Sequence, residues 1–179
     1  MTVRGLLLAA GAGRRMGTPK ALVDDWLERS VETLHDGGCV EVTVVLGAAV
    51  DEAVERLEGL AVATVVAEDW ADGMGASLRA GLASTDADHS AVLVTLVDLP
   101  DVGADVVRRV LADSVTAASR SRATYDGEPG HPVLIGRDHW AGVIETATGD
   151  KGARAYLAGR PVDLVECGDL ATGRDVDSR

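Results

Sequence analysis

The stretch that most constrains the fold is residues 3–22, which read VRGLLLAAGAGRRMGTPKAL. Its first part, Val3 to Ala10, has the length and apolar content of a strand that is buried on both faces. Glycines follow directly and are interleaved with arginine and lysine. A buried strand that ends in a glycine- and cation-rich turn predicts an α/β protein that binds phosphate at the end of a strand.

Similar apolar runs recur along the first half of the chain. Strands are expected at Val3 to Ala10, Val40 to Leu46, Leu60 to Val66 and Ala91 to Val97. Apolar residues at helical spacing lie between and after them, around residues 26–34, 50–57, 78–82 and 106–111. Strands that alternate with helices indicate βαβ units with right-handed crossovers. The pattern therefore predicts a three-layer, doubly wound α/β fold whose mixed sheet is mostly parallel.

The second half of the chain is less regular. A Gly/Pro-rich passage, Tyr125 to Pro132, leads into the apolar run Val133 to Ile135. Helical stretches are expected near Trp140 to Ala147 and Gly152 to Leu157, with a final strand from Val162 to Cys167. No repeat or linker divides the sequence, so residues 1–179 are expected to form a single domain.

Composition excludes several classes of partner. The formal net charge of −12 repels polyphosphate backbones and anionic headgroups, which argues against nucleic-acid and membrane binding. Cys39 and Cys167 lie far apart without metal-type spacing, so free thiols in a reducing compartment are expected. The apolar stretch at the N-terminus is too short for a signal sequence or a membrane span, and a cytoplasmic location is expected.

The glycine-rich turn has the chemistry of a local phosphate site. Gly11 and Gly13 let backbone N–H groups approach an anion, and Arg15 and Lys20 add charge-assisted donors. One cation near a phosphate oxygen contributes about 4 kcal/mol of Coulomb attraction before desolvation, which can outweigh a diffuse negative field. The spacing matches neither the P-loop motif nor the dinucleotide fingerprint.

The turn and four further segments together resemble the MobA/MocA-like nucleotidyltransferases, which include molybdenum cofactor guanylyl- and cytidylyltransferases. The resemblance extends over nearly the whole chain, in the segments Leu8 to Leu22, Trp70 to Gly81, Asp98-Leu99-Pro100, Gly130-His131-Pro132 with Gly149 to Arg154, and Asp175 to Ser178. It implies a Rossmann-like fold and transfer of CMP or GMP from a Mg²⁺-bound triphosphate, CTP or GTP, to a small phosphorylated acceptor. Pyrophosphate is released, and the implied acceptor is a molybdopterin-type cofactor. A molybdoenzyme or its maturation chaperone is the implied protein partner.

The resemblance also implies roles for individual residues. The expected catalytic residues are Arg15 and Lys20, and the expected metal ligands are Asp98 and Asp177. The expected nucleotide-binding residues are Leu8, Ala9, Ala10, Gly11, Gly13, Gly73 and Ser77. The expected acceptor-binding residues are His131, Lys151 and Arg154.

Simpler interpretations stay open for several of these residues. Asp98 could open an ordinary turn before proline, and Asp177 could lie on a solvated terminal segment. Gly73 and Ser77 could serve only to start a helix, and His131 could be structural. Asp150 is expected to cap the helix that carries Arg154.

Three other functions remain open. The same chemistry could act on a sugar phosphate or on methylerythritol phosphate. Some relatives are assigned as nicotine blue reductases, so an NAD(P)H-dependent reductase is a second class. The third is a nucleotide-binding regulator without turnover.

Overall fold

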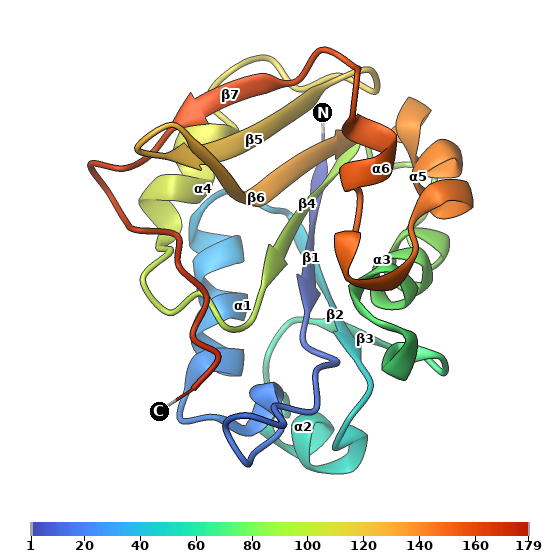
Figure 1. Cartoon of the computed structure of the whole chain (residues 1–179), viewed down its shortest axis with the longest axis vertical. Helices are drawn as coiled ribbons and strands as arrows, with labels where there is room; N and C mark the ends of the chain where they lie inside the picture. Colours follow the sequence, from blue (N-terminus) through green and yellow to red (C-terminus); the bar gives the residue numbers. More distant parts are fainter. Residues whose placement is uncertain (1, 179) are drawn as a thin grey trace.

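A seven-stranded sheet forms the middle layer of the protein (Figure 1), and the computed structural model describes residues 2–178. The strands lie in the order β3-β2-β1-β4-β6-β5-β7. All neighbouring strands are parallel except at β6, which is antiparallel to both β4 and β5. The strands are β1 (Val3–Leu8), β2 (Glu41–Leu46), β3 (Ala63–Val66), β4 (Ala91–Leu96), β5 (Arg120–Tyr125), β6 (Glu128–Gly136) and β7 (Asp163–Glu166). The expectation of a mixed, mostly parallel sheet is confirmed.

Helices cover both faces of this sheet, as Figure 1 shows. The α-helices are α1 (Trp26–Asp36), α2 (Val50–Arg56), α3 (Met74–Ala83), α4 (Ala104–Val110), α5 (Trp140–Thr146) and α6 (Arg154–Leu157). Short 3₁₀ turns are η1 (Lys20–Leu22), η2 (Trp70–Asp72), η3 (Arg137–His139) and η4 (Gly149–Lys151). Over residues 2–178, no helix combines the length and the apolarity that crossing a membrane requires.

Two aliphatic cores separate the layers. Leu7 and Leu93 point to the core beneath α1 and α4, whereas Leu6 and Val92 point to the core beneath α3 and α5. Alternate residues of one strand serve different cores because side chains in a strand alternate between faces. The sheet is therefore buried on both sides around β1 and β4, which fixes the positions of the loops that follow these two strands.

The region around residues 120–136 corrects the sequence analysis. The passage Tyr125 to Pro132, expected to be irregular, belongs to a β-hairpin in which Tyr125 pairs with Glu128. Asp126 and Gly127 form its two-residue turn with φ of 51° and 83°. Asp-Gly is the preferred pair where both turn residues need positive φ. The run Val133 to Ile135 is only the end of a nine-residue strand, and β5 was not expected at all.

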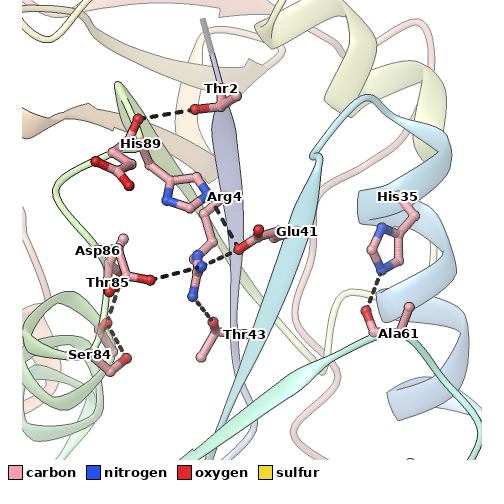
Figure 2. Close-up of polar contacts among 12 residues, drawn as sticks. Thr2, Arg4, His35, Glu41, Thr43, Ala61, Ser84, Thr85, Asp86 and His89 are labelled. Carbon is pink, nitrogen blue, oxygen red and sulfur yellow. Dashed lines mark hydrogen bonds and ion pairs between the residues drawn. The ribbon is translucent and has the colours of Figure 1, made fainter.

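An ionic cluster around the buried Arg4 lies at the amino edge of the sheet (Figure 2), and we call Arg4, Glu41, Thr43, Asp86 and His89 the Arg4 cluster. Arg4 donates to Thr43 Oγ1 at 3.1 Å and forms an ion pair with Glu41. Its guanidinium also lies 3.6 Å from Asp86, and His89 Nε2 lies 3.4 Å from Glu41. Because these residues come from β1, β2 and the loop before β4, the cluster ties three segments together.

Candidate active site

The candidate site lies at the carboxyl edge of the sheet, where β1 and β4 end side by side. These strands are parallel neighbours, and Leu8 pairs with Leu96 in register. The glycine-rich turn after β1 and Asp98 after β4 therefore leave the sheet at the same place. In a doubly wound sheet this is where the strand order reverses and where ligands bind.

The turn after β1 folds back on itself through its glycines. Gly13 has a φ of +58°, and a Cβ atom there would lie 1.8 Å from the carbonyl oxygen of Thr18. Backbone N–H groups of Met16 and Gly17 donate to the carbonyl of Gly13, both at 2.9 Å. The N–H of Lys20 donates to the carbonyl of Gly11 at 3.1 Å. A side chain at position 13 would open this turn, which brings Lys20 back over the end of β1.

Lys20 connects the two expected metal ligands. Its Nζ forms an ion pair with Asp98 and donates to Asp177 Oδ1 at 2.8 Å. Arg15 approaches the other oxygen of Asp177 at 3.3 Å. The N–H of Val176 donates to the carbonyl of Asp98 at 3.0 Å, which holds the C-terminal segment against the end of β4. Asp177 thus belongs to this cluster.

Burial and charge act in opposite directions on these groups. Burial by itself would lower the pKa of Lys20, but hydrogen bonds and charge from Asp177 and Asp98 raise it overall. Burial raises the pKa of Asp98, against the opposing effect of Lys20. The hydrogen bond from Lys20 lowers the pKa of the partly exposed Asp177. Lys20 is therefore a cation at neutral pH, placed between two acidic side chains.

Three carboxylates at this point could hold a metal ion. Asp98, Asp175 and Asp177 each offer one oxygen, and these oxygens lie within 4.8 Å of one another. Hard oxygen ligands of this kind suit Mg²⁺ or Mn²⁺. Asp175 was not among the expected ligands, although its Asp-x-Asp spacing with Asp177 is a signal that could have identified it.

A cavity of about 320 Å³ opens beside this cluster. Seven residues expected at the site line it: Leu8, Ala10, Gly11, Gly13, Lys20, Gly73 and Asp98. Arg14, Trp70 and Asp150 also line it, although no role in binding the nucleotide was expected of them. Four residues expected here lie outside the lining: Ala9, Ser77, Arg15 and Asp177. Ala9 and Ser77 are buried, Arg15 is exposed, and Asp177 contacts the lining through Lys20.

Gly73 allows the segment at Gly149 and Asp150 to pack directly against the backbone before α3. Its φ is +113°, and a Cβ atom there would lie 2.6 Å from Asp150 Oδ1. The side chain of Asp150 lines the cavity and forms no cap on α6, which has Ala153 at its N-cap position. The expectation that Asp150 caps the helix carrying Arg154 is therefore wrong.

A second, smaller cavity of about 70 Å³ adjoins the first, and both are lined by Leu8, Met74 and Asp150. The three expected acceptor-binding residues, His131, Lys151 and Arg154, all line this second cavity. Burial, together with the charges of Arg122 and Arg154, lowers the pKa of His131 to about 4. His131 is therefore neutral at physiological pH.

Arg122 also lines the second cavity and was missed because β5 was missed. Residues 120–125 alternate between polar and small or aromatic side chains, in the order RSRATY, and this period-2 pattern could have indicated the strand. Without the strand, nothing in the sequence connects Arg122 with His131.

Comparisons with known proteins identify the family of the chain. The model of the MobA-like NTP transferase domain matches residues 5–165. A curated relative, nicotine blue oxidoreductase of Paenarthrobacter nicotinovorans, is 40% identical and covers 98% of this chain and 92% of that protein.

Solved structures share the fold. The crystal structure of Rv0371c from Mycobacterium tuberculosis H37Rv has a TM-score of 0.83 at 26% identity, covering 99% of this chain and 94% of that one. A manganese complex of Rv0371c has a TM-score of 0.78 at 24% identity, covering 98% and 94%. A nucleotidyl transferase from Methanothermobacter, Mth528, has a TM-score of 0.83 at 21% identity, covering 99% and 92%. The chain belongs to the MobA-like NTP transferase family.

Proposed function

We propose that this protein transfers CMP or GMP from a metal-bound nucleoside triphosphate to a small phosphorylated acceptor and releases pyrophosphate. The observation that carries the proposal is the contact of Lys20 with both Asp98 and Asp177 beside the cavity of the glycine-rich turn. Family membership supports nucleotidyl transfer as the type of reaction.

The residues of the first cavity suit the demands of this chemistry. Nucleotidyl transfer depends mainly on positioning the reacting groups and on neutralising charge at the α-phosphoryl group and the leaving pyrophosphate. Backbone N–H groups of the turn at Gly11 and Gly13 would orient the phosphates. Lys20 and Arg15 would neutralise charge on them, Lys20 as a compact cation and Arg15 as a planar fork of donors. Neither side chain has to transfer a proton.

A divalent cation would be held by Asp98 and Asp177, with Asp175 beside them. Three carboxylate oxygens within 4.8 Å of one another are a fitting donor set, and the manganese complex of Rv0371c supports a divalent ion on this fold. The ion would neutralise triphosphate oxygens when bound. Magnesium is the ion we propose for this chain.

The second cavity is the proposed place of the acceptor. It adjoins the first cavity and is lined by His131, Lys151 and Arg154. An acceptor held there would have its phosphate near the triphosphate, as an attack on the α-phosphorus requires. A molybdopterin-type cofactor is the acceptor that the family resemblance implies.

Pyrophosphate release tests the proposal directly. The assay uses CTP, GTP, ATP and UTP, each with Mg²⁺ or Mn²⁺, and either a molybdopterin-type acceptor or a sugar phosphate. We expect metal-dependent release with CTP or GTP and the pterin. Absence of both metal-dependent triphosphate binding and pyrophosphate release with every acceptor would contradict the proposed function.

An NAD(P)H-dependent reductase is the second candidate, because the relative at 40% identity carries the name nicotine blue oxidoreductase. Two features of the fold argue against dinucleotide binding in the usual manner. The glycine-rich turn continues into η1 before α1 begins at Trp26, so no helix starts directly at the glycines. The end of β2 is followed by Gly47, Ala48 and Ala49 in place of an acidic residue that would bind ribose. Oxidation of NADH or NADPH with the pigment, followed by absorbance, separates the two candidates.

A further inference from the structure

The second cavity holds a buried cationic donor that no carboxylate neutralises. Arg122 Nε is buried and has no hydrogen-bond partner, and the guanidinium donates only one hydrogen bond, to the carbonyl of Gly130 at 3.0 Å. Among residues 2–178, no Asp or Glu forms an ion pair with Arg122. A buried donor without a partner costs free energy, and Arg122 lines a cavity through which an anion from outside the chain could reach it.

Two more cations face the same cavity. Lys151 and Arg154 line it and are exposed, so they lie at its mouth, while the walls include Leu78, Val133 and Leu157. Lys151 and Arg154 likewise form no ion pair within the described residues. The chain has 29 acidic side chains against 17 Lys and Arg, so carboxylates are abundant. The lining of this cavity thus has three cations against one carboxylate, Asp150, whereas acidic side chains outnumber Lys and Arg in the chain as a whole.

The charges of Arg122 and Arg154 affect the pKa values of nearby groups in the cavity. Arg154 and burial both lower the pKa of Arg122, with burial the larger effect, and both arginines contribute to the low pKa of His131. The part of these shifts that comes from Arg122 and Arg154 shows that their positive charges act on one another across the cavity, where an anion would be attracted. Its volume of about 70 Å³ suits a small anionic group.

We propose that Arg122 anchors a phosphate monoester group of the acceptor in the second cavity, with Lys151 and Arg154 completing the site at its mouth. This inference rests on the proposed function, and it makes the charge of the acceptor a determinant of specificity. An uncharged acceptor would leave Arg122 Nε without a partner and would bind poorly.

Inorganic phosphate is the probe for the test. Its dissociation constant is measured by calorimetry at constant ionic strength, with chloride as the reference salt, for the wild type and for Arg122→Gln and Arg122→Lys. Because phosphate could also bind at the glycine-rich turn, all variants are made in the Lys20→Gln background as well. Arg120→Gln is the matched control. Arg120 lies on the same strand but outside the lining of the second cavity, and its substitution removes the same charge.

We expect Arg122→Gln to weaken phosphate binding about tenfold or more, as for the loss of a charge-assisted hydrogen bond. Arg122→Lys should bind more tightly than Arg122→Gln, and Arg120→Gln should match the wild type within about twofold. Unchanged affinity in Arg122→Gln, an equal loss in Arg120→Gln, or no phosphate binding by the wild type would overturn the proposal.

Two further measurements keep the result unambiguous. If Arg122→Gln does not fold, the double variant Lys151→Gln with Arg154→Gln tests the proposal instead. Both side chains are exposed, so this variant should fold. The proposal requires that the double variant binds phosphate more weakly than the wild type. Binding of CTP or GTP with Mn²⁺ is measured on the same proteins. If the triphosphate binds but the substitutions leave phosphate affinity unchanged, only the proposed anion site is contradicted. If the triphosphate does not bind, the proposed function is contradicted.

Discussion

Ionic clusters lie at both edges of the central sheet, and they differ in what surrounds them. At the amino edge, the Arg4 side chain is 9% exposed and contacts Thr43 and the exposed carboxylates of Glu41 and Asp86. At the carboxyl edge, Lys20 contacts Asp98 and Asp177 in a similar way but lines a cavity of about 320 Å³. The Arg4 cluster joins strands, whereas the Lys20 cluster borders a cavity large enough for a ligand.

This difference shows that an ion pair alone does not indicate function. The Arg4 cluster includes buried atoms without partners, Arg4 Nε and His89 Nδ1, yet no described cavity reaches them. The Lys20 cluster is accessible and lies at the strand ends where the order of the sheet reverses. Access to a cavity at that edge is therefore the better criterion. Substitution of Lys20 should lower activity, whereas substitution of Arg4 should lower stability and leave activity nearly unchanged.

The largest effect is expected from Lys20→Met. Removing the cation that would neutralise phosphate charge should lower kcat/KM for pyrophosphate release by about 10² to 10³-fold. The measurement is the initial rate with Mn²⁺ and CTP or GTP. Arg4→Met serves as the control and should leave this rate within about twofold of the wild type. Equal losses of rate in both variants would remove the distinction between the two edges.

A pH effect is expected at the carboxyl edge through His131. Its folded-state pKa of about 4 lies below the ordinary value, so between pH 6.5 and 4 the unfolded chain binds a proton that the folded protein does not. The free energy of unfolding should therefore fall as pH decreases through this range, by on the order of 2 to 3 kcal/mol from this residue. Urea unfolding at several pH values measures this free energy. Its dependence on pH between 6.5 and 4 should be shallower for His131→Asn than for the wild type. Parallel curves for the two proteins would refute the assignment.

Arg4→Met should act on stability. It removes the cation that joins Glu41 to Thr43, and we expect the free energy of unfolding to fall by about 2 kcal/mol, less than for a fully buried pair because Glu41 is 56% exposed. Urea unfolding at pH 7 measures this loss. The double variant Arg4→Met with Glu41→Gln should recover part of it, and no recovery would mean that Arg4 contributes through packing alone.

The smallest effect is expected from Arg15→Gln. Arg15 is exposed and lies 3.3 Å from Asp177, so solvent screens its contribution. We expect the KM for the triphosphate to rise about three- to tenfold at low salt and the difference to shrink at high salt. A loss as large as that of Lys20→Met, independent of salt, would instead give Arg15 a role equal to that of Lys20.

Much of the fold could be predicted because it depends on local periodicity. The strands β1, β2, β3 and β4 and the helices after them follow from apolar runs and helical spacing. The hairpin of β5 and β6 was missed although Asp126-Gly127 marks its turn, because glycine and proline around it favoured an irregular reading. The β5 sequence, RSRATY, also has little apolar signal of its own.

Sequence by itself determined the type of site: a glycine-rich turn after a buried strand, a carboxylate after a parallel strand, and local cations in an acidic chain. These features depend on neighbouring residues and on the strand order they predict. Only the tertiary structure decided which distant side chains meet, because contacts between residues such as Lys20 and Asp177, or Arg122 and His131, depend on how the strands and the C-terminal segment pack. It also distinguished the Lys20 cluster, which borders a cavity, from the Arg4 cluster, which no described cavity reaches, since cavities form only when the layers assemble.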